Sequence, residues 1–539
     1  MARFQNHRRT VVIAPPPTPN GDLHVGHLAG PYLACDVYAR YLRAIGRDVV
    51  YTTGTDDSQT YVVASARRQG ITPESLAAES WHDIRATLAA TGMKVDGFAP
   101  FDDGYRRTVL DFVGALHDAG RFRQRTASFP YSEKTGEFLM EGLVSGECPK
   151  CLAESRGGLC EACGHPNNFN ELINPRSTVD PTDVLTTREA TILVLPLEEY
   201  REQLTAYYDS NSVKLRPHTR QLVQEVLAGP LPDFPITYPT AWGIPAPFPE
   251  TPDQTINAWV EGMPASMYCT AHAARELGEA PTADDELWLA ERDIELVYFL
   301  GFDNVYFWGM THLALLLAHE GRYCVPTAIV SNEFYELERE KFSTSKGHVV
   351  WGRDLVAEIP RDQVRFYLAL TAPEHQRTNF SRAALEKITH ERLTVPWNNL
   401  AVRLAKALSE LGSAFEPLPV SGEARRRAAT MVRRFETTYE LDGYSLTRAA
   451  DLIVSQLARL QERSEQLNDV CDDSAPILLG DLFLEARTLL AAASPILVDL
   501  AAAAAEAGGF EAELTISACE VTQVVPFMLP LLSTTVSAG

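Results

Sequence analysis

The segment from Thr10 to Ala44 places two histidines between a predicted strand and a predicted helix. The apolar run Thr10-Val-Val-Ile-Ala14 is typical of a buried parallel strand, and the sequence from Leu28 to Ala44 favours a helix. The connecting segment is Pro17-Thr18-Pro19-Asn20-Gly21-Asp22-Leu23-His24-Val25-Gly26-His27. A helix N-terminus presents unpaired N–H groups and the positive end of the helix dipole, so we expect a phosphate group to bind at this corner. Gly26 would let a backbone pass close to it.

A second segment, far along the chain, has the composition of a cationic loop. It reads Lys341-Phe342-Ser343-Thr344-Ser345-Lys346-Gly347. Such a loop can close over a polyphosphate, neutralise its charge in a transition state and open again for the leaving group. The same residue types are also ordinary in a solvated loop, so the prediction gains its strength from the pairing with His24 and His27.

The order of strand and helix signals predicts an α/β protein. Short β-rich runs alternate with helical stretches over the first 120 residues or so, which is typical of a Rossmann-like, doubly wound parallel sheet. We expect five parts: 1–120, the first half of this catalytic domain; 121–185, an inserted subdomain; 186–335, the second half; 336–395, the cationic loop and a connecting stem; and 396–539, an all-α helical bundle.

Four cysteines in the insert are spaced as metal ligands. Cys148, Cys151, Cys160 and Cys163 form the pattern C-x2-C-x8-C-x2-C. Two such turns supply the four thiolates that a tetrahedral structural zinc needs, whereas two incidental pairs of buried cysteines are the alternative. The sequence therefore predicts a zinc knuckle whose Zn²⁺ helps a small insert to fold.

Composition excludes several classes of protein. The 48 basic and 71 acidic residues give a formal net charge of −23, which argues against a generally basic nucleic-acid coat and against binding to anionic membranes. Neither a signal peptide nor an apolar run long enough to cross a membrane is evident, so we expect a cytoplasmic protein with reduced thiols.

The chain as a whole resembles methionyl-tRNA synthetases, which are class I aminoacyl-tRNA synthetases. In that family the two segments above correspond to the HIGH and KMSKS motifs. The similarity runs in order from about Val11 to about Leu400 and includes these further segments: Gly54-Thr55-Asp56-Asp57, the cysteine-rich insert, Asn170-Glu171-Leu172-Ile173-Asn174-Pro175-Arg176, Trp242-Gly243-Ile244-Pro245, Trp259-Val260-Glu261, Gly301-Phe302-Asp303 and Asn399-Leu400-Ala401-Val402-Arg403.

The resemblance implies roles for individual residues in making an aminoacyl adenylate from ATP, with Mg²⁺, and an amino acid. The catalytic residues would be His24, His27, Lys341 and Lys346. ATP would be bound by Gly26, Asp303, Ser343 and Ser345, with Asp303 on the ribose. The amino acid would be bound by Pro17, Thr18, Asp56, Trp259 and Trp308, with Asp56 on its ammonium group.

Several positions depart from the pattern of the family. Thr344 replaces the second lysine of KMSKS, and we expect Lys341 and Lys346 to share its work. The aromatic residue of the first motif is Thr18, the histidine of a Tyr-Phe-His segment is Trp308, and an Asp-Ala-Pro segment reads Glu261-Gly262-Met263. An arginine is replaced by Tyr238 and a histidine by Ser58. Because several pocket walls change at once, we expect that methionine is not the best substrate.

The helical part carries mixed signals for tRNA binding. Asn399 and Arg403 share one helical face, and the family reads anticodon bases with an Asn and an Arg at this spacing. The tryptophan that the family stacks on a base is absent, and the matching stretch, Leu467 to Ser474, is acidic. A stripe formed by Arg426, Arg427, Arg433 and Arg434 could face nucleic acid or simply solvent.

These observations predict an ATP-dependent ligase that activates an amino acid and transfers it to tRNA. The main alternative is a tRNA-independent amide or dipeptide ligase that passes the acyl group to a small amine. A third possibility is a synthetase-like regulator without catalysis, but the combination of His24, His27, Asp56, Asp303 and Lys341 argues against it.

Overall fold

The computed structural model describes residues 8–167, 171–211, 215–342, 347–411, 416–468, 474–509 and 521–533. The chain packs as two compact units. Unit 1 comprises residues 1–23, 49–88 and 94–333, and unit 2 comprises residues 24–48, 89–93 and 334–539. The predicted corner at His24 is therefore where the chain first passes from unit 1 to unit 2. The five-part division of the sequence is finer than this and stays a prediction.

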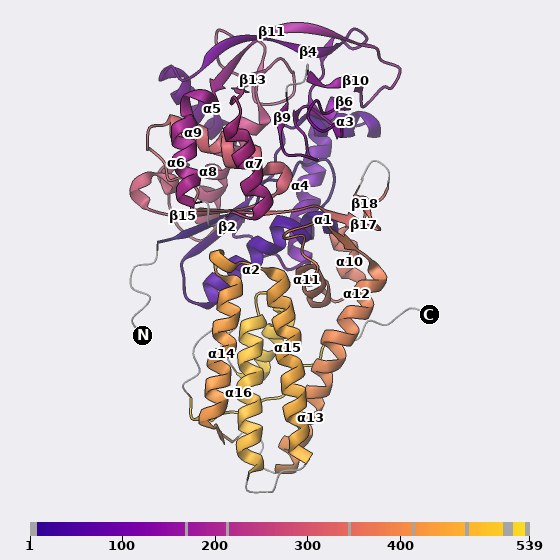
Figure 1. Ribbon diagram of the computed structural model, residues 1–539, viewed down its shortest axis with the longest axis vertical. Coiled ribbons are helices and arrows are strands. Elements are labelled where there is room, and N and C mark those ends of the chain that lie inside the picture. Colours follow the sequence, from indigo (N-terminus) through magenta and orange to yellow (C-terminus); the bar gives the residue numbers. More distant parts are fainter. Residues whose placement is uncertain are drawn as a thin grey trace. The chain divides into compact units, whose positions relative to one another are not determined.

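Unit 1 is built on a parallel sheet with the strand order β16-β15-β1-β2-β3 (Figure 1). The strands are β1 (Thr10–Ile13), β2 (Val49–Thr53), β3 (Gly97–Phe98), β15 (Glu295–Gly301) and β16 (Ala328–Asn332). β1 pairs with β2 on one side and with β15 on the other, so the strand order reverses at β1. In open α/β sheets ligands bind beyond the carboxyl ends of the strands at such a point. The α/β Rossmann-like fold expected from the sequence is confirmed.

The core of unit 1 surrounds this sheet. Apolar residues of β1 and β15 pack with those of α5 (Asp103–Asp118), α8 (Ala258–Glu276) and α9 (His312–Ala318). α8 also packs on β2 and β3. The other helices and short strands of unit 1 are α3 (Thr60–Gln69), α4 (Pro73–Ala90, whose last two residues belong to unit 2), α6 (Arg201–Asn211), α7 (Pro217–Ala228), β13 (Thr237–Tyr238) and β14 (Thr255–Ile256).

The cysteine-rich insert expected from the sequence is a β-rich region within unit 1. Two long strands, β4 (Arg123–Ser132) and β11 (Leu185–Pro196), form an antiparallel ladder, seen as the arched ribbons in Figure 1. β5 (Glu137–Phe138) and β12 (Asp233–Pro235) extend this sheet at its edges. Smaller strands lie between β4 and β11 in the sequence and carry the cysteines: β6 (Val144–Glu147), β7 (Glu154–Ser155), β8 (Gly158–Leu159), β9 (Pro166–Asn167) and β10 (Ile173–Ser177).

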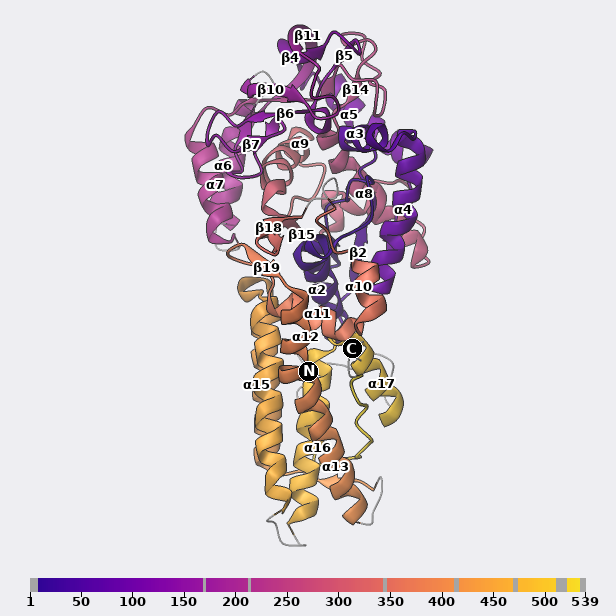
Figure 2. The same ribbon diagram turned by 90° about the vertical axis from the view of Figure 1, so that its right-hand side faces the viewer.

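Unit 2 ends in the helical bundle expected from the sequence. Its long helices lie side by side in Figure 2, and α15 packs against α13, α14 and α16. They are amphipathic, with apolar residues such as Leu404, Phe435 and Leu457 turned inward. Their bounds are α13 (Val395–Leu411), α14 (Gly422–Tyr439), α15 (Leu446–Glu465), α16 (Ala475–Ala493) and α17 (Val498–Gly508), and a short ladder of β20 (Leu418–Pro419) and β21 (Gln523–Val524) closes beside α16.

The rest of unit 2 combines the segment after His24 with residues beyond Phe334. The predicted helix from Leu28 begins as a π-helical turn, Leu28–Tyr32, and continues as α2 (Leu33–Ala44). A small sheet has the order β18-β17-β19. The remaining elements are α1 (Val25–His27), β17 (Tyr335–Leu337), β18 (Glu340–Lys341), β19 (Thr378–Phe380), α10 (Gly352–Glu358), α11 (Arg361–Leu370) and α12 (Arg382–Thr389).

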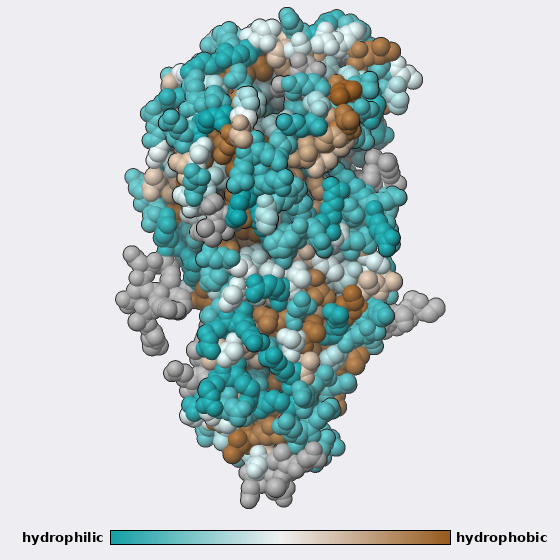
Figure 3. Space-filling model, viewed as in Figure 1, coloured by the Kyte–Doolittle hydropathy of each residue, from teal (hydrophilic) through white to brown (hydrophobic). Residues whose placement is uncertain are grey.

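The surface fits the composition. On the face shown in Figure 3 most of the surface is hydrophilic, and hydrophobic residues form small separate groups. Among the helices that the structure describes, none is both long and apolar enough to cross a membrane.

Candidate active site

The histidine corner and the start of the cationic loop lie together within unit 2. The imidazoles of His24 and His27 stack with ring centroids 3.7 Å apart, and the ring of Phe342 stacks on His24 at 4.5 Å. The backbone N–H of Val25 donates to the carbonyl oxygen of Val350 at 2.9 Å. Two segments separated by most of the chain therefore meet at this point.

Gly26 is required by the close packing of this corner. A Cβ atom at position 26 would lie 2.9 Å from the Phe342 ring and 3.0 Å from the His24 ring, closer than real Cβ atoms come to their neighbours. The backbone N–H of His24 donates to Nδ1 of His27 at 3.3 Å, which fixes the orientation of the second ring. Glycine here allows the three rings to stack directly above the backbone.

The surroundings of both histidines favour the neutral imidazole over the charged form. Burial, the neighbouring His27 and Lys341 lower the pKa of His24 well below its ordinary value. Protein atoms packed around its ring lower the pKa of His27 as well, although the residue is exposed. Lys341 is exposed on β18, with its Nζ 5.6 Å from the ring centroid of Phe334. The predicted residues Ser343, Ser345 and Lys346, and with them Thr344, lie outside the described residues.

The predicted amino-acid site lies in unit 1, beyond the end of β2. The backbone N–H of Asp56 donates to the carbonyl oxygen of Pro17 at 3.0 Å, so these two predicted residues are neighbours. The amide of Gln59 donates to Oδ2 of Asp56 at 2.8 Å. Thr18 follows Pro17 and is partly exposed. Burial and the nearby charge of Glu261 raise the pKa of the Asp56 carboxyl well above its ordinary value.

The two predicted tryptophans occupy different environments. Trp259 is partly exposed at the start of α8, and its indole stacks on Phe307 with centroids 3.8 Å apart. Its Nε1–H donates to Oε1 of Glu141 at 2.6 Å. Trp308 is only 2% exposed and packs edge-on against Tyr298 at 5.4 Å, in the core of unit 1. Trp259 can therefore line an open pocket, whereas Trp308 fills the space behind it.

Sequence reasoning missed the role of buried carboxylates around this pocket. Glu261, on α8, is fully buried and accepts a hydrogen bond from the hydroxyl of Tyr105 at 2.9 Å. Glu141 is also buried, beside Trp259. Burial raises the pKa of each carboxyl to about 7. The available signal was a lone Glu within an apolar stretch, Phe138-Leu-Met-Glu-Gly-Leu-Val144 in one case and Trp259 to Met263 in the other.

Asp303 follows β15, as predicted, and so lies beyond the carboxyl end of that strand in the parallel sheet of unit 1. It lies in a short 3-10 turn, Phe302–Asn304, and accepts from the side-chain amide of Asn304 at 3.2 Å. A Cβ on Gly301 would lie 2.4 Å from Oδ1 of Asp303, so glycine is needed for this orientation of the carboxylate. The carboxylate is partly exposed and can accept from a ribose hydroxyl.

The four cysteines of the insert form one cluster. The Sγ atoms of Cys148, Cys151, Cys160 and Cys163 all lie within 4.8 Å of one another, and those of Cys151 and Cys160 are 3.6 Å apart. A tetrahedral zinc with four Zn–S bonds of about 2.3 Å requires sulfur separations of about 3.8 Å. The donor set and its spacing fit the zinc knuckle predicted from the sequence, and these four thiolates would hold the ion.

The zinc knuckle packs against Phe302, the residue that precedes Asp303. Gly164 has φ of +75°, and a Cβ there would lie 2.6 Å from Leu222 and 3.0 Å from Phe302. The ring of Phe302 stacks on His218 at 3.7 Å. The fold of the insert thus supports the turn that presents Asp303.

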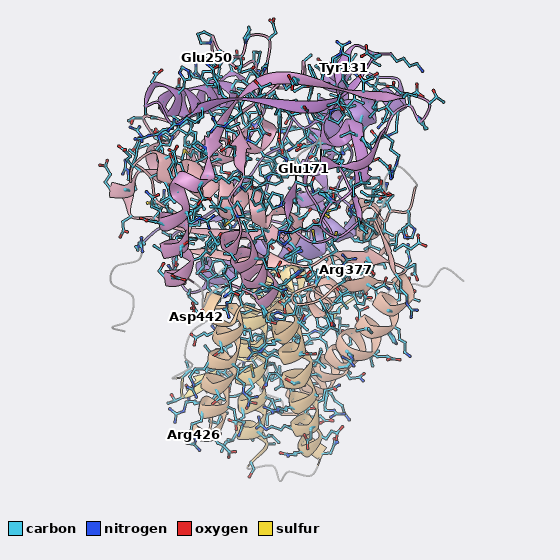
Figure 4. All side chains as sticks on the ribbon, turned by 45° about the horizontal axis from the view of Figure 1, so that its top comes forward. Tyr131, Glu171, Glu250, Arg377, Arg426 and Asp442 are labelled. Atoms are coloured by element: carbon cyan, nitrogen blue, oxygen red, sulfur yellow. The ribbon has the colours of Figure 1, made fainter. Side chains whose placement is uncertain are left out.

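The residues predicted for tRNA binding differ in whether their side chains already bond to other residues of the bundle. Asn399 is exposed on α13, but Arg403 donates to Oγ of Ser464 at 2.9 Å and so is held against α15. Arg427 pairs with Glu423 at 2.8 Å and with Glu485 at 3.0 Å. Arg426, labelled in Figure 4, lies at the outer surface of α14.

Comparison with known proteins gives a consistent result. A family model described as class I tRNA synthetases (M) matches residues 10–405. A methionine–tRNA ligase of Roseiflexus sp. (strain RS-1) is 32% identical over 464 residues, which is 84% of this chain and 77% of the relative. One from Roseiflexus castenholzii is 32% identical over 447 residues, 80% of this chain and 74% of the relative.

A solved structure shows the same fold over the whole chain. Mycobacterium tuberculosis methionyl-tRNA synthetase in complex with methionyl-adenylate superposes with a TM-score of 0.77 at 20% identity, covering 98% of this chain and 99% of that one. The family match over residues 10–405, together with the relatives at 32% identity, goes beyond a shared fold. The chain belongs to the methionyl-tRNA synthetase family of class I aminoacyl-tRNA synthetases.

Proposed function

We propose that the chain activates an amino acid with ATP, forming an aminoacyl adenylate and diphosphate, and then transfers the aminoacyl group to the 3′ end of a tRNA. The observation that carries this proposal is the stack of His27, His24 and Phe342, which joins the histidine corner to the base of the cationic loop. The exposed Lys341, next to Phe342 in the sequence, is close enough for its charge to lower the pKa of His24.

In this reaction the main role of these groups is to stabilise negative charge on the phosphates. A carboxylate oxygen of the amino acid attacks the α-phosphorus, the bond to the bridging oxygen breaks, and diphosphate leaves. The imidazole N–H groups of His24 and His27 donate to phosphate oxygens on which charge accumulates, and Lys341 adds a positive charge. Asp56 would hold the substrate ammonium and Asp303 the ribose. Bound Mg²⁺ would neutralise part of the triphosphate charge.

The comparisons support both half-reactions. The Mycobacterium tuberculosis protein was solved with methionyl-adenylate, and the curated relatives are methionine–tRNA ligases. A cavity of about 820 Å³ in unit 1 reaches Phe307, which stacks on Trp259. It offers room for an acceptor beside the candidate amino-acid pocket.

A second candidate function is tRNA-independent transfer to a small amine. Arg403, suggested for anticodon contacts, is bonded to Ser464, and Arg427, from the stripe that could face nucleic acid, is paired with carboxylates, so both groups are already engaged within the bundle. Weakened anticodon contacts favour an enzyme that kept amino-acid activation and changed its acceptor.

The test is to incubate the protein with ATP, Mg²⁺ and a panel of amino acids, with and without total tRNA, and to analyse the products by mass spectrometry. We expect AMP, diphosphate and aminoacylated tRNA. Amide formed from an added amine without tRNA would favour the second candidate. Failure to form AMP with every amino acid, in both conditions, would exclude both and leave the regulator as the remaining alternative.

A further inference from the structure

A second cavity of unit 1 is lined by residues that the predicted substrate site does not use. Its volume is about 550 Å³, which lies in the range of small-molecule pockets. Its walls come from the segment after β2, from α4, from the segment that leads into α5 and from the loop between β13 and β14. The lining includes Asp57, Glu74, Trp81, Phe101, Arg106 and Trp242. The residues predicted to bind the activated amino acid do not line this cavity, so it is a separate site.

Aromatic side chains form the walls of this cavity, and two of them are held in place by the backbone. The Nε1–H of Trp242 donates to the carbonyl oxygen of Asp57 at 2.9 Å, and that of Trp81 donates to the carbonyl oxygen of Ala99 at 3.2 Å. Part of each indole remains exposed, as does part of the Phe101 ring. Such walls favour an apolar group, and an aromatic group above all, because aromatic rings attract one another beyond the area they bury.

The cavity also contains a carboxylate that is almost fully buried. Asp57 is 7% exposed, and its Oδ2 accepts a hydrogen bond from the hydroxyl of Thr55 at 2.5 Å. Arg106 is the cation whose charge acts on Asp57, but its ion pair is with Asp103. Burial raises the pKa of the Asp57 carboxyl to about 6. A buried carboxylate at the wall of a cavity is a suitable partner for an ammonium group, which brings a positive charge and three donors.

Arg106 supplies a positive charge at the same cavity. Its guanidinium group lies 4.4 Å from the centroid of the Phe101 ring, and this cation–π contact holds it in place. Its ion pair with Asp103 is 3.2 Å long and involves a carboxylate that is 97% exposed, so the pair contributes little to stability and can be exchanged for a ligand. In the described part of the chain, Arg106 and Asp57 therefore line one cavity without pairing with each other.

We propose that this cavity binds a free α-amino acid with an aromatic side chain, in addition to the amino acid that is activated. The ammonium group binds Asp57, the carboxylate binds the guanidinium group of Arg106, and the side chain packs against Trp81 and Trp242. A ligand with both charges is favoured over a phosphorylated one, because phosphates would meet the carboxylates of Asp57 and Glu74. The inference does not depend on the proposed function, since the residues assigned to adenylate formation do not line this cavity.

The test is calorimetric titration of the full chain, without ATP, with L-phenylalanine and with two analogues that each lack one charge, phenethylamine and 3-phenylpropionate. We expect phenylalanine to bind at least about tenfold more tightly than either analogue. Arg106→Gln should weaken the binding of phenylalanine at least about tenfold and hardly change that of phenethylamine. Because Arg106 is partly exposed, this variant should fold normally. Arg107→Gln, at an exposed position of the same helix, is the matched control.

A second variant tests the other end of the ligand. Asp57→Asn should weaken the binding of phenylalanine and of phenethylamine by similar factors, with Asp111→Asn, exposed on α5, as its control. The inference would be overturned if phenylalanine did not bind at up to about 10 mM, or if phenethylamine bound as tightly as phenylalanine. It would also be overturned if phenylalanine bound the Arg106→Gln protein with unchanged affinity and lost its binding only in Asp56→Asn, since the ligand would then occupy the predicted substrate pocket.

Discussion

The two units bury charged groups in opposite ways. In unit 2 the guanidinium group of Arg365 is 2.6 Å from the carboxylate of Asp36, and both side chains are almost fully buried. Arg365 also donates to the carbonyl oxygens of Pro495 and Ile496. In unit 1 the equally buried Glu261 has no salt-bridge partner among the described residues, and its Oε1 accepts a hydrogen bond from the hydroxyl of Tyr105.

A second network in unit 2 repeats the paired arrangement. Arg427 and Arg463 meet Asp481 and Glu485, which joins α14, α15 and α16. Paired and hydrogen-bonded charges of this kind hold helices in register. The contrast teaches that burial alone does not identify a site, because the paired Arg365 and Asp36 are buried as deeply as Glu261.

The largest effect should come from breaking a complete pair in unit 2. Asp36→Asn removes the charge that neutralises Arg365 and leaves a buried cation, so we expect a loss of about 3–5 kcal/mol in the free energy of unfolding. Urea unfolding followed by circular dichroism measures it. Asp451→Asn, at an exposed position of α15, is the control and should change stability by less than about 0.5 kcal/mol. If Asp36→Asn also changed the free energy of unfolding by less than about 0.5 kcal/mol, buried ion pairs would not be what distinguishes unit 2 from unit 1.

The next effect concerns the histidine corner of unit 2. Nδ1 of His24 is buried and has no partner among the described residues, and His27 stacks on the same ring. If these groups are completed by phosphate, His27→Ala should lower the rate of ATP–diphosphate exchange by about 10²–10³, the usual cost of removing one transition-state donor. The unfolding midpoint should hardly change. His390→Ala, exposed in the same unit, serves as the control, and normal exchange by His27→Ala would show that the imidazole is not catalytic.

Local patterns of sequence were enough to predict much of this molecule. The apolar runs that became β1, β2, β15 and β16 are short and buried, and the repeated Cys-x2-Cys spacing specifies a cluster without long-range information. The surroundings of individual side chains in the folded protein were harder to predict. Trp308 was expected to line the pocket, which stays a prediction; it is only 2% exposed and packs on Tyr298 of β15, a strand that the sequence alone does not place beside it.

Missing partners are harder still to predict from sequence. Nothing near Glu261 in the sequence shows that Tyr105 will bond to its carboxylate, since that depends on how α5 packs on α8. Likewise, Arg403 was expected to share a helical face with Asn399 and Arg427 with Arg434, yet Arg403 is bonded to Ser464 of α15 and Arg427 to Glu485 of α16. Charge pattern predicts which groups are available, and tertiary packing decides which remain unpaired.

The smallest expected effect is a pH-dependent gain in the stability of the Glu261→Gln variant. Burial raises the pKa of Glu261 to about 7 from an ordinary value of 4.5. The folded state therefore binds more protons than the unfolded state between these values, and this group lowers the stability of unit 1 as pH rises from 4.5 to 7. Glu261→Gln removes that cost. We expect the variant to be more stable than the natural protein at pH 8 by up to about 3 kcal/mol, and nearly equal to it at pH 4.5. Calorimetric unfolding at the two pH values measures this, with Glu276→Gln, at an exposed position of the same helix, as the control. A variant destabilised at pH 8 would mean that the hydrogen bond from Tyr105 outweighs the cost of burying the Glu261 charge, and the contrast between the two units would then be lost.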